Sequence, residues 1–469
     1  MVPPGTDTNP LRVAIIGAGP SGFYVAEHLF NQPGLVVEID MLERLPTPYG
    51  LVRGGVAPDH QKIKAVTATY DTIAAHPGFH FYGYVEFGKD LTLHDLRQMY
   101  HQIVYATGAQ TDQHLGIPGE DLHGSWPATA FVAWYNGHPD FRDYQFDFSH
   151  ERVAVVGVGN VAVDVARILC RTPEELATTD IADYALDALR HSRIREVHML
   201  GRRGPAQAVF TNPELKELGE LAAADVRVLP EEVALDDLSR AALEKSQDRA
   251  THRKLELLQR YAAQRATTKP RQLLIRFLVS PVELLGNAHG QVAAVRLVQN
   301  VLYPTEAGTL RPHPTEHYET VPVGLVFRSV GYRGVPLPDV PFDERWGVIL
   351  NQQGRVLDAE TLQPRVGEYA TGWIKRGPTG VIGTNKPDAL ETVRCMVGDL
   401  GQGAMLHPTH PQATAAAKRI QARQPLYFSY PDWRRLNTLE VARGRAMGRP
   451  RVKFTQVEAM LTARRHTEA

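Results

Sequence analysis

Two glycine-rich turns are the residues whose types and spacing best fit a chemical role. The first, Gly17-x-Gly19-x-x-Gly22, follows the apolar run 11–16 and precedes a helical pattern. In such a turn the first glycine permits the tight bend, the second lets a pyrophosphate approach the backbone, and the third allows close helix packing. Glu43 ends the next predicted strand, where a carboxylate binds ribose hydroxyls and repels a 2′-phosphate. The pattern predicts a site for FAD or NAD rather than NADP.

The second turn, Gly157-Val-Gly159-Asn160-Val161-Ala162, follows the apolar run 152–156. Its third glycine is replaced by alanine, which still permits close packing. The next predicted strand, 196–200, leads into Arg202 and Arg203 instead of an acidic residue. Two guanidiniums can hold a phosphate by bidentate, charge-assisted hydrogen bonds, so NADP(H) is the expected ligand. The alternative is a pair of solvated loop arginines.

Strands that alternate with helices predict the fold class. We expect an α/β protein with two doubly wound Rossmann-like domains, parallel sheets and helices on both faces. The NADP-binding domain, 112–335, is expected to be inserted into an FAD-binding domain formed by 1–111 and 336–469. Within the former, 273–279 and 291–297 are predicted to form a strand pair.

Composition limits the remaining classes of function. The chain has 469 residues, with 51 Lys and Arg against 52 Asp and Glu, so no overall field favours nucleic acid or anionic lipid. The two distant cysteines, Cys170 and Cys395, exclude a CxxC redox pair, a four-thiolate zinc site and a Cys-ligated cluster. No metal site is expected. The absence of a signal-peptide pattern and of an apolar run of ~20 residues predicts a cytoplasmic protein without membrane segments.

Several longer segments match motifs of a known family. They span 46–53, 55–64, 157–169, 201–205, 328–334, 372–385 and 448–453. Together with the two turns they resemble the adrenodoxin-reductase family of FAD-dependent NADPH–ferredoxin reductases, especially its mycobacterial-type bacterial members. The match covers nearly the whole chain. Val158, between the glycines of the second turn, is a departure from the family pattern, and its side chain is expected to point away from the diphosphate.

The resemblance implies site residues. FAD contacts are implied at Gly17, Gly19, Ser21, Gly22, Glu43, Leu51, Val85, Trp373, Gly380, Val381 and Ile382. NADP contacts are implied at Gly157, Gly159, Asn160, Val161, Arg202, Arg203, Glu214 and Gly380. The family also implies an ion pair of His60 with Glu217 beside the nicotinamide, where it would hold charge and geometry.

The function that follows is hydride transfer from NADPH to FAD, then single-electron transfer to an acidic ferredoxin by a monomer or weak dimer. Alternatives are an electron-input subunit of a larger complex, a disulfide reductase and a non-catalytic NADP sensor. A basic stretch, 245–271, is a candidate docking surface for the ferredoxin, although a charge-rich helix is as often a solvated face. Its cations are Lys245, Arg249, Arg253, Lys254, Arg260, Arg265, Lys269 and Arg271.

Overall fold

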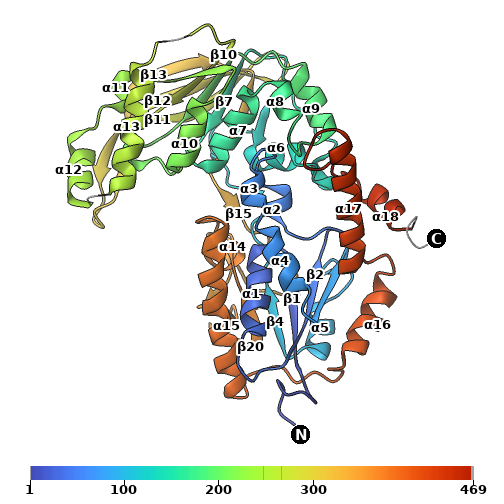
Figure 1. The fold of residues 1–469 in the computed structure, drawn as a ribbon. Helices are drawn as coiled ribbons and strands as arrows, with labels where there is room; N and C mark the ends of the chain where they lie inside the picture. Colours follow the sequence, from blue (N-terminus) through green and yellow to red (C-terminus); the bar gives the residue numbers. More distant parts are fainter. Residues whose placement is uncertain (1, 247, 266, 466–469) are drawn as a thin grey trace. The chain divides into compact units, whose positions relative to one another are not determined.

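The computed structural model describes residues 2–246, 248–265 and 267–465, which divide into two compact units (Figure 1). The first unit contains the chain up to Val56, from His60 to Thr111 and from Gly331 onward; the second contains Ala57–Asp59 and Asp112–Val330. The second unit is therefore an insertion in the first. The sequence predicts domain boundaries at 111/112 and 335/336, and the dinucleotide that each unit binds is a separate prediction.

A seven-stranded sheet forms the centre of the first unit, in the order β18-β19-β20-β4-β1-β2-β3. The five strands from β20 to β3 are parallel, while β18 and β19 extend the sheet in antiparallel pairs. The strand bounds are β1 Leu11–Ile16, β2 Val37–Glu43, β3 Phe79–Gly83, β4 Gln102–Tyr105, β18 Asn351–Gln352, β19 Arg355–Leu357 and β20 Pro364–Ala370.

Helices cover both faces of this sheet. Alternate residues of β1 point to opposite faces, so Val13 and Ile15 join one buried cluster while Ala14 and Ile16 join another. The first cluster includes residues of α1 Pro20–Phe30, α4 Thr67–Ala74, α15 Asn385–Gly401, α17 Tyr430–Ala446 and α18 Val457–Arg465. The second includes residues of α5 Leu93–Met99 and α16 Ala413–Arg423. Helices α1 and α15 lie side by side (Figure 1).

Short elements complete the first unit. They are α2 Leu51–Gly54, α3 Gln61–Lys64, β5 Thr111–Asp112, β15 Tyr332–Arg333, β16 Phe342–Asp343, β17 Val348–Ile349, α14 Trp373–Arg376 and η3 Ile382–Thr384; the last residue of β5 already belongs to the second unit.

A six-stranded parallel sheet forms the centre of the second unit, in the order β6-β14-β7-β8-β10-β9. Its strands are β6 Ser125–Pro127, β7 Arg152–Val156, β8 Glu196–Leu200, β9 Ala224–Val228, β10 Arg271–Arg276 and β14 Leu325–Arg328. The helices are α6 Ala128–Tyr135, η1 Pro139–Phe141, α7 Asn160–Cys170, α8 Pro173–Leu176, α9 Asp183–Arg190, η2 Pro205–Gln207, α10 Asn212–Gly219, α11 Pro230–Val233, α12 Asp237–Ser246 and α13 Arg249–Ala263.

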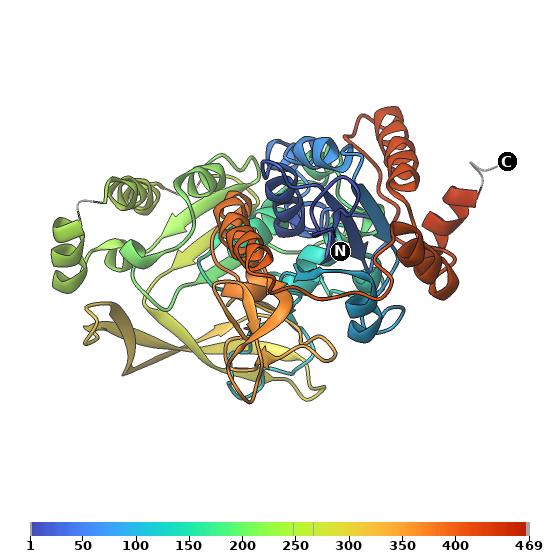
Figure 2. The same cartoon turned by 90° about the horizontal axis from the view of Figure 1, so that it is seen from below.

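The other face of this second sheet carries strands instead of helices. An antiparallel sheet of β11 Val279–Gly286, β12 Val292–Pro304 and β13 Leu310–Pro322, seen from below in Figure 2, packs there, with Val295 and Leu297 against Ala154 and Val156. The α/β class with two Rossmann-like units is confirmed, but the expectation of helices on both faces was wrong here. The predicted pairing of 291–297 with 273–279 was also wrong, because Leu278 has φ +57°, which separates β10 from β11, and β12 pairs with β11.

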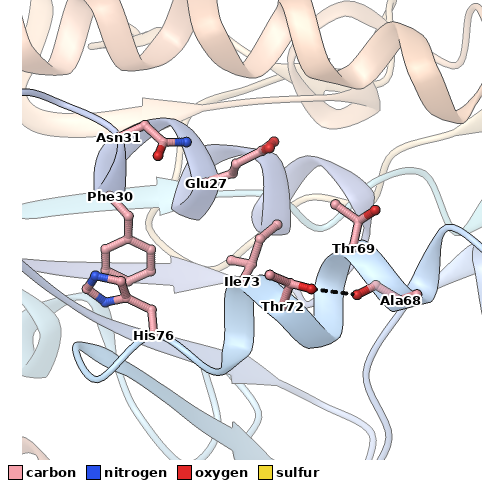
Figure 3. A pocket seen from close by; sticks show the side chains of 8 residues that line it. All are labelled: Glu27, Phe30, Asn31, Ala68, Thr69, Thr72, Ile73 and His76. Carbon is pink, nitrogen blue, oxygen red and sulfur yellow. Dashed lines mark hydrogen bonds between the residues drawn. The ribbon is translucent and has the colours of Figure 1, made fainter.

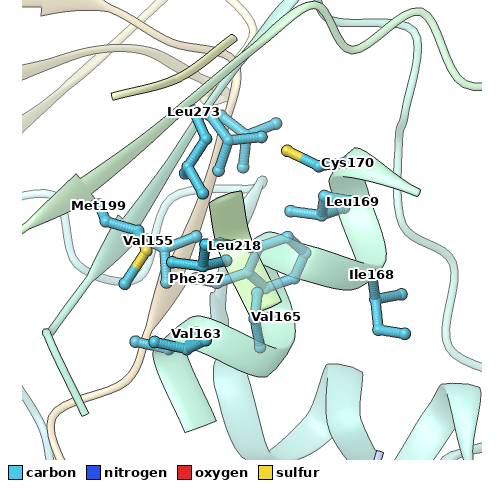
Figure 4. Packing of buried hydrophobic residues seen from close by; sticks show 14 of the residues in the cluster. Val155, Val163, Val165, Ile168, Leu169, Cys170, Met199, Leu218, Leu273 and Phe327 are labelled. Carbon is cyan, nitrogen blue, oxygen red and sulfur yellow. The ribbon is translucent and has the colours of Figure 1, made fainter. Parts of the chain in front are cut away.

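An aromatic core lies between the helices and the six-stranded sheet of the second unit. Phe131 of α6 stacks on Phe327 of β14 with ring centroids 4.5 Å apart, and both rings are fully buried. Figure 4 shows part of the same cluster, in which residues of α7 contact the strands. Among the residues that the structure describes, none of the helices has both the length and the apolar character of a transmembrane span.

Truncation of this core should destabilise the protein. Phe131→Ala is expected to lower the free energy of unfolding by about 3–5 kcal/mol, because it removes a buried ring and leaves a cavity. Trp346→Ala is the control, since this side chain is 65% exposed, and a change within about 0.5 kcal/mol is expected. Urea denaturation followed by circular dichroism measures both. Equal changes in the two variants would contradict the assignment of Phe131 to the core.

Candidate nucleotide-binding sites

The turn between β1 and α1 is a backbone cradle that only glycine can form. Gly17 has φ +105°, and a Cβ there would come 2.6 Å from the carbonyl oxygen of Ala106. A Cβ at Gly22 would overlap the carbonyl oxygen of Gly17. Gly19 has no heavy atom within 4 Å of its Cβ position in the described structure, so open space lies before the helix N-terminus. That N-terminus has no side-chain cap from any described residue, and an anion can take the place of one.

Glu43 lies beside this turn at the end of β2. Its two carboxylate oxygens accept hydrogen bonds from the N–H groups of Ala18 and Leu45, each at 3.0 Å. Burial raises the pKa of Glu43, while these two hydrogen bonds oppose the shift. The carboxylate is therefore held in one orientation next to the glycine cradle, and its remaining lone pairs can accept from ribose hydroxyls.

A segment from the distant end of the chain meets the same cradle. Gly372 has φ +73°, and a Cβ there would overlap Oγ of Ser21. Ser21 Oγ also donates to Oδ1 of Asn385 at 3.2 Å. The indole Nε1 of Trp373 donates to the Thr379 carbonyl at 3.1 Å, which fixes the ring. Gly372 and Trp373 are thus positioned at the N-terminal end of α1.

The other FAD residues predicted in the first unit have varied exposure. Leu51 begins α2 and is half-buried. Val85 is buried, and its N–H donates to the Glu43 carbonyl at 2.9 Å, which places it next to the end of β2. Gly380 has φ +78° and Val381 is 55% exposed, so this loop presents backbone and an apolar side chain to its surroundings; Ile382 is half-buried.

Asp388 is a residue that sequence reasoning missed. Its carboxylate accepts from the Gly372 N–H at 2.5 Å and lies 3.1 Å from Nζ of Lys375. It stabilises the left-handed backbone of Gly372 before Trp373. The available signal was an acidic residue in the first turn of a predicted helix, which is typical of an N-terminus, but that signal does not say which loop the side chain contacts.

The second unit repeats the cradle between β7 and α7. Gly157 has φ +134°, and a Cβ there would overlap the carbonyl oxygen of Ser329. Gly159 is the N-cap of α7, again without a side-chain cap from the described residues, and Ala162 is fully buried against the sheet. Asn160 Oδ1 accepts from the N–H of Thr211 at 3.0 Å, so its side chain is positioned at the turn; Val161 follows it, half-buried.

Arg202 and Arg203 follow β8, as expected from the sequence. The Arg202 carbonyl accepts from Asn300 Nδ2 at 2.9 Å, and the Arg203 carbonyl from the Leu278 N–H at 3.1 Å. In the described part of the chain neither guanidinium meets a carboxylate. Burial and the neighbouring charge of Arg202 both lower the pKa of Arg203. Two like charges held together, with no carboxylate partner among the described residues, have the chemistry to bind a dianionic phosphate.

Helix α10 carries both predicted acidic residues of the second unit. Thr211 and Glu214 form a capping box, in which the Glu214 carboxylate accepts from the Thr211 N–H at 3.1 Å. The Glu217 carboxylate lies 3.8 Å from Nε of Arg167. His60 belongs to the first unit and Glu217 to the second, so their ion pair stays a prediction. The predicted contact of Gly380 with NADP also stays a prediction, because Gly380 belongs to the first unit.

A surface groove of about 480 Å³ lies between α1 and α4 (Figure 3). His76 stacks on Phe30 there with ring centroids 3.7 Å apart. Its lining includes Asn31, which follows the C-terminal end of α1, whereas the glycine cradle is at the N-terminal end. The groove is therefore separate from the glycine cradle. Among the described residues, no three His, Cys, Asp or Glu side chains come together as metal ligands.

Gly19→Ala tests the first cradle. The new methyl group meets no protein atom within 4 Å and φ is ordinary at −86°, so the free energy of unfolding of the apoprotein should hardly change. A bound diphosphate would collide with it, so the ratio of flavin to protein absorbance after purification is expected to fall at least about tenfold. The control is Gly398→Ala in α15, which has equal space and should keep its flavin. Full flavin content in Gly19→Ala would contradict the site.

Comparison with known proteins gives the family. Residues 11–204 match the family model described as pyridine nucleotide-disulphide oxidoreductase. A probable ferredoxin/ferredoxin–NADP reductase of Mycobacterium tuberculosis is 45% identical over 460 residues, covering 97% of this chain and 76% of that protein. The NADPH-ferredoxin reductase FprA of the same organism is 43% identical, covering 96% and 98% of the two chains.

Two further comparisons agree. The human mitochondrial NADPH:adrenodoxin oxidoreductase is 41% identical, covering 96% of this chain and 91% of that protein. The solved structure of M. tuberculosis FprA in complex with NADPH superposes with a TM-score of 0.91 at 42% identity, covering 97% of this chain and 100% of that one. The resemblance seen in the sequence is thereby confirmed: the chain belongs to the adrenodoxin-reductase-type family of NADPH–ferredoxin reductases.

Proposed function

We propose that this protein is an FAD-dependent oxidoreductase that takes hydride from NADPH and passes single electrons to a ferredoxin-type iron–sulfur protein. One observation carries the proposal: a single chain builds two glycine cradles, one beside a strand that ends in Glu43 and the other beside a strand that is followed by Arg202 and Arg203. The cofactors are FAD and NADP(H). Bound FAD supplies the chemistry, since it accepts a hydride and releases electrons one at a time.

The residues of the first unit fit FAD. The open space at Gly19 admits a diphosphate, and Glu43 is oriented to accept from ribose hydroxyls. Trp373 and the exposed backbone from Gly380 to Ile382 would hold and cover the planar ring. The protein's part is to orient the ring and exclude water from it.

The residues of the second unit fit NADPH. Arg202 and Arg203 would bind its 2′-phosphate, while Asn160 and the turn around it would bind the diphosphate. Glu214 would contact the nucleotide from the first turn of α10. His60 and Glu217 would fix the charge and the side-chain positions around the nicotinamide and would not serve as acid and base, since a hydride transfer moves no proton.

The two cysteines argue against one alternative, a disulfide reductase. A disulfide reductase needs a dithiol, but Cys170 lies buried in the second unit and Cys395 lies in the first. Burial raises the pKa of Cys170 to about 12, so its thiol is unreactive. An electron-input subunit or an NADP sensor would share both cradles, and turnover with ferredoxin distinguishes these. A cytoplasmic location and a monomer or weak dimer remain predictions.

Neutralising Arg202→Gln together with Arg203→Gln tests the phosphate assignment. NADPH affinity should fall by about 3 kcal/mol, roughly 100-fold, because two charged contacts are lost, whereas NADH affinity should stay within about twofold. Anaerobic titration of the flavin absorbance gives both constants, and bleaching of the wild-type flavin by NADPH tests the proposed function itself. Equal losses for the two nucleotides would refute the assignment.

The basic stretch 245–271 retains only part of its predicted surface charge. Residues 247 and 266 lie outside the described residues. Lys254 is buried and donates to the Ala208 carbonyl, Lys269 Nζ donates to the Leu221 carbonyl at 2.7 Å, and Arg271 donates to carbonyls after α7, at 2.8 Å for Arg171. These three cations bind backbone within the unit. The exposed cations are Lys245, Arg249, Arg253, Arg260 and Arg265.

We infer that an acidic ferredoxin docks on the exposed face of α13. Arg249, Arg253 and Arg260 recur at spacings of four and seven, which places them on one side of the helix. Positive charge on one helix face attracts an acidic partner and raises the association rate at low salt.

Arg253→Glu together with Arg260→Glu tests this surface. At low salt the double variant should lower kcat/KM for ferredoxin at least about tenfold and leave reduction of a small artificial acceptor unchanged. Added salt should diminish the difference, because charges beyond ~10 Å are screened at 0.1 M. Arg190→Glu with Arg195→Glu is the control, with the same change of net charge on exposed residues of the same unit. Equal losses in both double variants would count against docking on α13.

A further inference from the structure

Arg167 is a fully buried cation at the centre of an ion cluster in the second unit. It lies on α7, the helix that begins at the second glycine cradle. Its guanidinium contacts the Asp59 carboxylate, lies 2.6 Å from Oδ1 of Asp164 and 3.8 Å from Oε2 of Glu217. Burial lowers the pKa of Arg167, but the carboxylates of Asp164 and Asp59 raise it by more. The side chain is charged at any physiological pH.

Two partners of Arg167 are linked to the predicted ion pair of His60 with Glu217. The first partner is Glu217 itself. Asp59 is the residue before His60, the other member, and belongs to the segment Ala57–Asp59 of the second unit. The Asp59 side chain is only 9% exposed, so its carboxylate is held firmly. One guanidinium therefore hydrogen-bonds the residue before His60 and forms a longer ion pair, of 3.8 Å, with Glu217.

We propose that Arg167 is a positioning residue for hydride transfer, which orients the Glu217 carboxylate and fixes the Asp59 backbone from which His60 continues. The proposal rests on the proposed function. Arginine suits this role because its rigid planar fork bonds separate carboxylates at set angles, whereas a lysine ammonium is a point charge on a flexible stem. A displacement of 1 Å at a reacting site can slow a reaction by about 100-fold.

Arg171 provides a matched comparison. Its Nε lies 2.8 Å from the same Asp59 carboxylate oxygen, and its other ion pair, with Glu175, is 3.1 Å long. Its side chain is 25% exposed, and it forms no ion pair with Glu217 among the described residues. A variant of Arg171 leaves both the Arg167–Asp59 contact and the Arg167–Glu217 ion pair in place.

The test compares Arg167→Lys with Arg171→Lys in the FAD-loaded enzyme. After anaerobic mixing with saturating NADPH, the rate of flavin bleaching should fall about tenfold in Arg167→Lys, with NADPH affinity within about twofold of wild type. Arg171→Lys should change both by less than about twofold. Loss of NADPH affinity alone in Arg167→Lys would overturn the proposal, because it would mean that Arg167 only supports the nucleotide-binding helix.

A double-mutant cycle separates positioning from general stability. If Arg167 acts through Glu217, Arg167→Lys should slow bleaching by less than about twofold in a Glu217→Gln background. The same tenfold loss in both backgrounds would overturn the proposal. Hydrogen exchange gives a readout independent of turnover: amides in a peptide that covers 57–64 should exchange faster in Arg167→Lys and not in Arg171→Lys.

A second cycle applies if Arg167→Lys does not fold. Asp59→Asn and Glu217→Gln each remove one carboxylate partner of Arg167, and the proposal predicts non-additive effects on the bleaching rate, whereas additive effects would overturn it. If NADPH does not bleach the wild-type flavin, the proposed function fails and the inference fails with it. Normal wild-type bleaching with additive cycles refutes the role of Arg167 alone.

Discussion

Both units depend on the same steric constraint, which is the close approach of a neighbouring strand to the first glycine of a turn. In the first unit the carbonyl oxygen of Ala106, just after β4, lies 2.6 Å from where a Cβ of Gly17 would be. In the second unit the carbonyl oxygen of Ser329, just after β14, takes the equivalent place at Gly157. In each sheet the strand before the turn lies between that neighbour and the next strand of the motif. Any side chain at the first glycine would separate these strands and close the cradle.

In the proposed function, charge makes two similar cradles specific for different nucleotides. Glu43 is fixed by two backbone N–H groups beside its cradle, and a 2′-phosphate there would meet a carboxylate. The equivalent strand of the second unit, β8, is followed by two arginines whose carbonyls accept hydrogen bonds from Asn300 and Leu278. The backbone thus holds two guanidiniums together at a separation that their mutual repulsion opposes, and an anion relieves that repulsion.

Local patterns allowed the prediction of the cradles, because the signals for each lie in one continuous stretch, 11–43 for the first and 152–203 for the second. The return of Asn385 and Asp388 to the first cradle was not predictable, since Asn385 bonds Ser21 across most of the chain. Pairing of β12 was missed because a single residue, Leu278 at positive φ, divides one apolar run into two strands. Charge counts also failed to distinguish exposed cations from those, such as Lys254, that bind backbone carbonyls.

The buried ions of the second unit are better explained by geometry than by stability. Removing Arg167 and the Asp59 carboxylate from water costs several kcal/mol per ion, and apolar residues of similar volume often stabilise a core more. Helix α7 could pack its apolar face on the sheet without a charge, as its fully buried Val163 and Ile168 do. Apolar residues cannot hold the Asp59 and Asp164 carboxylates by hydrogen bonds or attract a third carboxylate, that of Glu217 on α10, which lies 3.8 Å away. These three carboxylates come from three different segments of the unit.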